Sequence, residues 1–157
     1  MMRFAELYNT LDSTTKTNDK LAAMSAYFGS VDGLDAAWAI HFLSGNKLRQ
    51  LVPTKLLRGW AAEEAGIPDW LFEESYHAVG DLAETLTLTV PPGETTNDHS
   101  LAFWVTERLM PLRKLEQAAQ REAILTIWRQ TPTHLRLVVM KLITGSFRVG
   151  VSKRLVM

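Results

Sequence analysis

A loop that leads into a helix start occurs twice in this sequence, about 100 residues apart. The first copy covers residues 44–57 and the second covers residues 144–156. Each begins with a hydroxyl residue and a glycine, continues through an apolar residue and an arginine, and ends in a cation that opens an apolar segment. A motif repeated at this distance predicts a fold of two similar halves, because each copy occupies a corresponding place in its half.

Both copies contain the parts of an anion site. Glycine lets the backbone approach a ligand closely, and the amides at a helix start attract negative charge. Arg49 and Arg148 occupy equivalent positions, as do Lys55 and Arg154. Two such sites on one rigid body fit a partner with repeated phosphates, of which duplex nucleic acid is the obvious one. The candidate contacts are Gly45, Asn46, Lys47, Arg49, Thr54, Lys55, Thr144, Gly145, Ser146, Arg148, Gly150, Ser152, Lys153 and Arg154.

The same strings have a plainer interpretation, in which both glycines only end helices and the cations are only solvated. For a single copy that interpretation is the better one. Because the same spacing of basic residues occurs twice, the anion-site interpretation is favoured for the pair. The copies also differ, because Pro53 stands where the second copy has Ser152. Proline has no amide to donate, so the first site is expected to be the weaker one.

The formal net charge of zero hides an uneven distribution. Residues 1–100 carry 7 Lys and Arg against 14 Asp and Glu, a balance of −7, whereas residues 101–157 carry 10 against 3, a balance of +7. A net charge of zero does not exclude a polyanionic partner, because binding of a polyanion depends on where the positive charges lie and not on their sum. The two parts could also pack together and partly neutralise each other, and both interpretations stay open.

Apolar residues recur at helical spacing along the chain, which predicts one compact all-α domain of about eight to ten helices. Residues 86–90 alternate as a strand would, but no partner strand is evident, so a helix end is favoured. Residues 91–98 form a loop between halves of about 1–90 and 99–157. The expected helices cover residues 4–11, 21–28, 36–43, 53–65, 68–90 with a break at Gly80, 101–110, 116–130 and 133–143, and a last one starts near Ser152.

Helix ends are predicted from capping and stop residues. We expect Asp32 or Asp35 to cap the helix before Leu43, and Thr131 or Thr133 to cap the one before Ile143. Gly66 should end a helix and Pro111 should stop another. The last helix signal continues to Met157, so we expect further chain beyond it.

Nothing in the sequence indicates catalysis. It contains no cysteine, no histidine pair at metal-binding spacing and none of the common phosphate-loop or nucleophile motifs. Asp81 and Glu84 lie one helical turn apart, where they could bind a metal, but a cap at Asp81 and a helix contact through Gly80 are favoured. The five tryptophans could stack on bases, but core packing is favoured for most of them, and Trp70 is expected to be a partly exposed anchor. No run of 18 apolar residues is present, so no membrane span is predicted.

Several strings together resemble the N-terminal DNA-binding domain of ATP-dependent DNA ligases, most closely the bacterial ones. They are residues 3–8, 14–20, 66–74, 80–85 and 144–152, in order along essentially the whole chain. The strings Gly80–Glu84 and Phe147–Val151 are the most specific. The resemblance implies two pseudo-symmetric helical halves that grip the minor groove and backbone on both sides of a nick. By position, its DNA contacts fall on Gly45 to Lys55 and on Thr144 to Arg154.

The resemblance also implies catalytic domains that follow this one and carry a Lys-x-Asp-Gly motif, whose lysine is adenylated by ATP. None of the lysines here begins that motif. We therefore expect no catalytic residue and no cofactor in this chain, with ATP and Mg²⁺ belonging to the missing domains. The chain should bind a nick, positioning it for sealing in replication, recombination or repair, but should not seal it.

The expected partners are nicked duplex DNA and covalently linked catalytic domains. We expect the protein to be a monomer, located at the nucleoid in the bacterial cytoplasm. The alternative is a helical protein-interaction module that does not bind nucleic acid, in which the acidic part docks a basic partner. A contiguous positive surface that contains both repeated loops would favour the DNA-binding interpretation.

Overall fold

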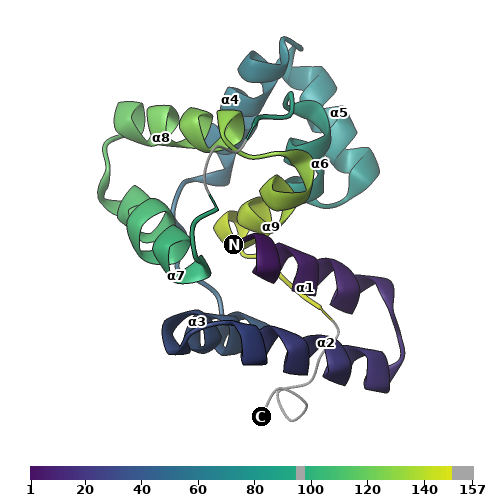
Figure 1. Ribbon diagram of the computed structural model, residues 1–157. Coiled ribbons are helices and arrows are strands. Elements are labelled where there is room, and N and C mark those ends of the chain that lie inside the picture. Colours follow the sequence, from purple (N-terminus) through teal and green to yellow (C-terminus); the bar gives the residue numbers. More distant parts are fainter. Residues whose placement is uncertain (95–97, 150–157) are drawn as a thin grey trace.

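The computed structural model describes residues 1–94 and 98–149, and within them all the regular secondary structure is helical, which confirms the predicted all-α class (Figure 1). Residues 95–97 and 150–157 lie outside the described part. The elements are α1 (Met2–Ser13), α2 (Thr17–Ser30), α3 (Gly33–Leu43), α4 (Thr54–Ala65), α5 (Asp69–Val79), α6 (Leu82–Thr89), α7 (Leu101–Phe103), the π-helical turn η1 (Trp104–Leu109), the 3₁₀ helix η2 (Met110–Lys114), α8 (Gln117–Arg129) and α9 (Thr133–Thr144). None of the described helices has the length and apolar character needed to cross a membrane.

The core is organised around α9, which is buried along most of its length. Six of its buried residues are apolar, and the other two are the cations Arg136 and Lys141. It packs mainly against α6 and also against α1, and Figure 1 shows it between these two helices. The second repeated loop continues directly from its end, so the most buried helix of the domain sets the position of that loop. The predicted pseudo-symmetry of the halves stays a prediction.

Several helix ends lie where the sequence predicts them. The carboxylates of Asp32 and Asp81 cap α3 and α6, each accepting a backbone N–H at 2.9 Å. Gly66 and Gly80 end α4 and α5 in the left-handed conformation, at φ 68° and 81°. Residues 82–89 form one helix, so the alternating segment is a helix end and not a strand.

Pro111 does not stop the helix that precedes it. The chain continues through η1 into η2, and Pro111 lies in the first turn of η2. Proline is tolerated there because the first amides of a helix have no partner within it. The sequence shows the proline but not the change of helix type. The basic pair Arg113 and Lys114 lies in the last turn of η2.

Two further predictions about local contacts are wrong. Neither Thr131 nor Thr133 caps α9, because Pro132 occupies the cap position and the Thr131 hydroxyl donates back to the Ile127 carbonyl at 2.7 Å. Gly80 makes no close helix contact, since a β-carbon placed there would meet nothing within 4 Å. Its left-handed backbone is the reason for glycine at that position.

The described part of the 91–98 loop is held in place by a buried arginine. The guanidinium of Arg136 donates to the carbonyls of Val90 and Pro91, both at 2.7 Å, and to that of Trp128. Burial lowers the pKa of Arg136, although these carbonyls satisfy its donors. A β-carbon at Gly93 would collide with the backbone of α8. These contacts join the predicted boundary loop to the core.

Ion pairs connect the basic C-terminal part to the acidic helices α4 and α6. They are Arg121–Glu63 (N···O 3.2 Å), Arg129–Glu64 (3.3 Å), Lys141–Asp81 (3.0 Å) and Lys141–Glu84 (3.6 Å). The predicted mutual neutralisation therefore does occur, but it uses cations of α8 and α9. Within the described residues, the cations of the two repeated loops (Lys47, Arg49, Lys55 and Arg148) are not among them.

Candidate nucleic-acid interface

The first repeated loop is anchored by apolar residues and exposes its cations. α3 ends at Leu43, and Gly45, two residues later, has a left-handed backbone (φ 90°) that turns the chain away from the helix axis. Farther along, Leu51 and Val52 are buried in the core. Lys47 and Arg49 lie between these fixed points and are exposed. Burial of Leu51 and Val52 and the turn at Gly45 thus hold two cations at the surface.

Contacts from the C-terminal part fix the shape of this loop. The side-chain amide of Gln120, on α8, donates to the carbonyls of Leu112 at 2.9 Å and Leu51 at 3.4 Å. The guanidinium of Arg113, on η2, donates to the Arg49 carbonyl at 3.4 Å. η2 therefore lies beside the first loop and adds two exposed cations, Arg113 and Lys114, to its surroundings.

Our sequence interpretation missed Arg113 and Lys114. The doublet is visible in the sequence, but 64 residues separate Arg113 from the carbonyl it contacts. A charged doublet at the end of a short helix is usually only a solvated surface feature. The contact that brings it to the first loop arises from tertiary packing, for which a single sequence carries no local sign.

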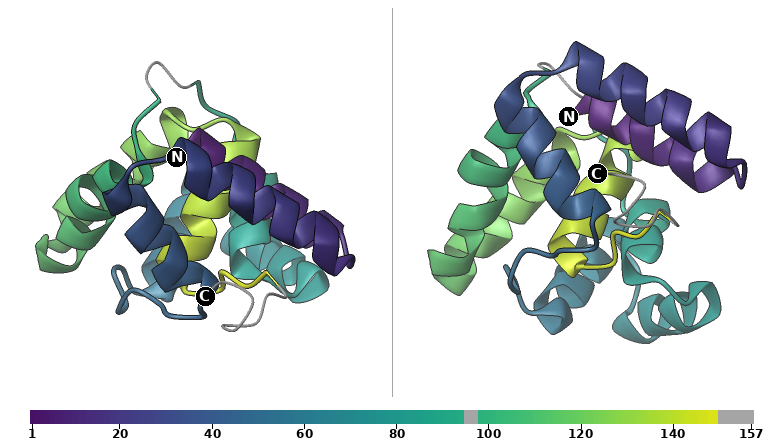
Figure 2. Two further views of the ribbon diagram at one scale, coloured as in Figure 1. Left: turned by 60° about the horizontal axis from the view of Figure 1, so that its bottom comes forward. Right: turned by 90° about the horizontal axis from the view of Figure 1, so that it is seen from below.

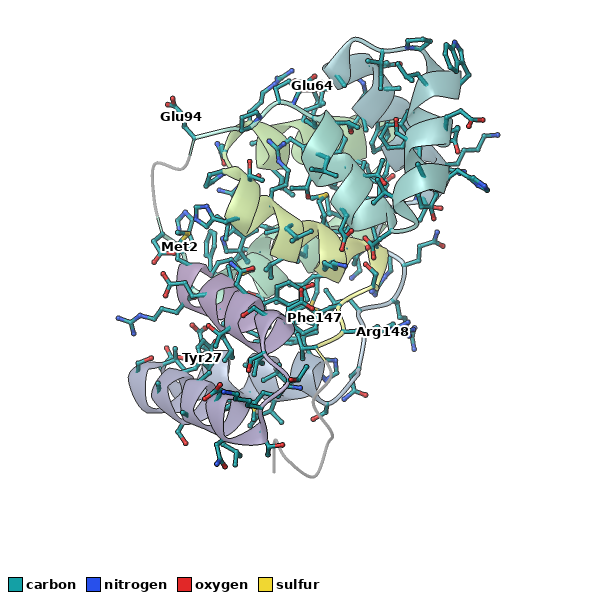
Figure 3. The ribbon with its side chains drawn as sticks, turned by 90° about the vertical axis from the view of Figure 1, so that its right-hand side faces the viewer. Met2, Tyr27, Glu64, Glu94, Phe147 and Arg148 are labelled. Carbon is teal, nitrogen blue, oxygen red and sulfur yellow. The ribbon has the colours of Figure 1, made fainter. Side chains whose placement is uncertain are left out.

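The second repeated loop is anchored by an aromatic side chain. Phe147 stacks on Phe4 of α1, with ring centroids 5.3 Å apart, and also contacts Tyr8 and Phe42. Arg148 is exposed, although the residues on either side of it are buried, as in an extended segment with alternating sides. Figure 3 shows Phe147 among the helices and Arg148 at the edge of the molecule.

The two loops lie side by side. A β-carbon at Gly145 would be 3.5 Å from Cδ of Lys47, so the Lys47 stem lies against the glycine that opens the second loop. Figure 2 shows segments 44–53 and 145–149 at the same end of the molecule. We call this surface the basic end. Its described cations are Lys47, Arg49, Lys55, Arg113, Lys114 and Arg148.

The cations of the basic end are available to a ligand. Within residues 1–94 and 98–149 none of the six forms an ion pair, in contrast to Arg58, Arg121, Arg129 and Lys141. All six are exposed. Cations gathered without carboxylate partners create a local positive potential that the net charge of the chain does not reveal.

The start of α4 supplies backbone donors next to these cations. Pro53 is the cap residue and offers no side-chain cap, while its carbonyl accepts the amides of Leu56 at 3.0 Å and Leu57 at 3.3 Å. In the described part of the chain, the amides of Thr54 and Lys55 have no partner. Although Pro53 removes one donor, as predicted, the first site keeps these two amides at a helix N-terminus.

The remaining candidate residues are placed as follows. Asn46 is exposed, Thr144 and Ser146 are half-buried, and the hydroxyls of Thr144 and Ser146 lie 2.9 Å apart. Gly150, Ser152, Lys153 and Arg154 lie outside the described residues, as does the predicted last helix, so their roles stay predictions. The carboxylates of Asp81 and Glu84, which the sequence leaves open as a metal pair, both face the Lys141 ammonium.

Comparison with known proteins identifies the family of the chain. The family model described as "DNA ligase N terminus" matches residues 1–157, which include both loops and η2. No curated protein matches the chain.

Proposed function

The chain belongs to the DNA ligase N-terminal family, and we propose that it holds nicked duplex DNA through the basic end, without reading the base sequence. The observation that carries the proposal is the juxtaposition of the two repeated loops. Lys47 of the first loop lies against Gly145 of the second, and the cations around them lack carboxylate partners within the described residues. A duplex could therefore contact both loops at once.

The chemistry of the basic end suits phosphate groups. Arginine guanidinium groups such as those of Arg49 and Arg148 can each donate two parallel hydrogen bonds to one phosphate. The open amides of Thr54 and Lys55 add neutral donors at the positive end of the α4 dipole. Contacts of this kind fix where the protein sits on the duplex and carry no sequence information. Loops from distant parts of the chain would hold phosphates on either side of the nick.

The sealing reaction itself is assigned to catalytic domains covalently linked to this one. The printed sequence has no Lys-x-Asp-Gly motif in which ATP could adenylate a lysine. ATP and Mg²⁺ are accordingly proposed as ligands of those domains, and this domain acts by positioning the nick during replication or repair. The chain alone should bind a nick and leave it unsealed.

Charge reversal of single residues tests the proposal. Arg49→Glu and Arg148→Glu should each weaken binding to a fluorescent nicked duplex about tenfold, a loss of about 1.4 kcal/mol, because a phosphate contact becomes a repulsion. Lys16→Glu makes the same charge change at an exposed site in the α1–α2 turn and should change the affinity less than twofold. Fluorescence anisotropy at one fixed salt concentration gives all three values.

Equal losses in all three variants would mean that only the net charge matters and that the basic end is not the site. Unchanged binding in both arginine variants would favour the protein-interaction module instead.

A further inference from the structure

Helix α5 is the most weakly buried of the long helices in the described structure. Of its eleven residues only Phe72 is buried. Trp70 is 66% exposed and Leu71 is 38% exposed, while Trp60, Trp104 and Trp128 are all in the core. An exposed tryptophan beside an exposed leucine contributes little to folding, and such residues are typical of sites where another molecule binds.

Not all of the acidic residues in and around α5 form ion pairs within the described structure. Residues 54–89 contain seven acidic side chains, five of which form ion pairs within the described structure. The two that pair with no described residue are Asp69 and Glu74, and both belong to α5. Asp69 directly precedes Trp70, and Glu74 follows it by four residues, one helical turn along the same face.

This arrangement suits a cation and disfavours DNA. The face of an indole ring attracts lysine and arginine side chains, and nearby carboxylates strengthen that attraction. A phosphate backbone would meet two unpaired carboxylates here. In Figure 1 α5 forms the upper right corner of the molecule, away from α2 and α3.

We propose that α5 is a docking surface for a basic segment of a partner protein, separate from the basic end. An arginine or lysine of the partner would stack on Trp70 between Asp69 and Glu74, and apolar partner side chains would cover Leu71. The proposal goes beyond DNA binding and does not depend on it. It rests on the exposed indole and on the two carboxylates that have no ion pair within the described chain.

The test uses two synthetic amphipathic helical peptides as probes. One has leucines along one face flanked by arginines, and the other has glutamates in place of the arginines. The chain has five tryptophans, and the indole N–H signal of Trp70 is identified by its disappearance in Trp70→Phe. In NMR titrations the arginine peptide should shift the Trp70 signal saturably, and the glutamate peptide should not.

Variants decide whether the contact is the proposed one. Trp70→Ala should weaken the arginine peptide about tenfold, and Asp69→Asn or Glu74→Gln several-fold. Glu107→Gln, which removes an exposed carboxylate on η1, is the matched control and should have no effect. Equal losses for Glu74→Gln and Glu107→Gln, or unchanged affinity in Trp70→Ala, would overturn the proposal.

Two more measurements ask whether a second copy of the chain or the duplex occupies α5 instead. If the Trp70 signal shifts on raising the protein concentration alone, the occupant is a second copy and the proposal fails. If Trp70→Ala weakens nicked-duplex binding more than twofold, α5 belongs to the DNA surface and the proposal also fails. Arg148→Glu should keep full affinity for the arginine peptide, so failure of DNA binding and failure of docking are distinguishable.

Discussion

At the scale of single residues, Gly145 sets the direction of the second loop. Its backbone is left-handed at φ 73°, a conformation that costs residues with a β-carbon about 1 kcal/mol or more. Gly145→Ala should therefore lower the free energy of unfolding by about 1 kcal/mol, measured by urea denaturation. The neighbouring Lys47 stem is at ordinary contact distance, so the loss arises from the backbone.

Gly59, within α4, is the matched control for this substitution. A β-carbon there meets nothing within 4 Å and the backbone is helical, so Gly59→Ala should raise stability by about 0.5–1 kcal/mol. A change of the same sign in both variants would contradict the assigned role of Gly145.

The sequence predicted the two repeated loops of the basic end but not the contribution of η2. Gly45 and Gly145 are recognisable as helix stops because a left-handed residue is nearly always glycine. Arg49 and Arg148 were recognisable because they occupy equivalent positions in the two repeated copies. Arg113 was not, because its role depends on the Arg49 carbonyl, which only tertiary packing brings near.

At the scale of elements, the α6–α9 contact is completed by a largely buried lysine. The Lys141 side chain is 8% exposed, and its ammonium lies 3.0 Å from Asp81 and 3.6 Å from Glu84. Burial alone would lower the pKa of Lys141, but the hydrogen bond to Asp81 and the nearby charges raise it overall. The charged form is therefore favoured by folding.

Lys141→Met should lower the free energy of unfolding by about 1–2 kcal/mol at neutral pH, because it leaves Asp81 without its partner in a partly exposed site. The contribution of Lys141 is fully present below pH 10.5, the ordinary pKa of lysine, and is lost as pH rises through the raised pKa of the folded state. Urea denaturation of both proteins from about pH 7 to about pH 12 measures this.

Lys114→Met serves as the control, since Lys114 is exposed and forms no ion pair with any described residue, and it should change stability by less than about 0.5 kcal/mol. A stability difference for Lys141→Met that stays constant across the whole pH range would contradict the assigned ion pair.

Helices were predicted well where the spacing of apolar residues agrees with residues that start or stop a helix, as at α4 with Pro53 before it and Gly66 after it. The prediction failed at η1 and η2, where Pro111 is a first-turn residue and not a stop. Proline occurs both in the first turn of a helix and at the end of one, and only the surrounding backbone shows which applies.

At the scale of the whole molecule, the structure shows which charges neutralise each other. The acidic helices α4 and α6 take their partners from α8 and α9, which leaves the basic end without carboxylate partners in the described part of the chain. The sequence showed the imbalance between its two parts, but not this division. Figure 2 places both loops at one end, as a shared duplex would require.

The central claim is that one duplex contacts both loops, and the salt dependence of binding tests it most directly. Anisotropy of the chain on nicked duplex should give a plot of log Kobs against log salt with a slope of about −3 to −5, since each neutralised phosphate contributes about −0.9. The double variant Arg49→Glu and Arg148→Glu should reduce that slope in magnitude by about 2. An unchanged slope in the double variant, or no binding even at low salt, would contradict the claim.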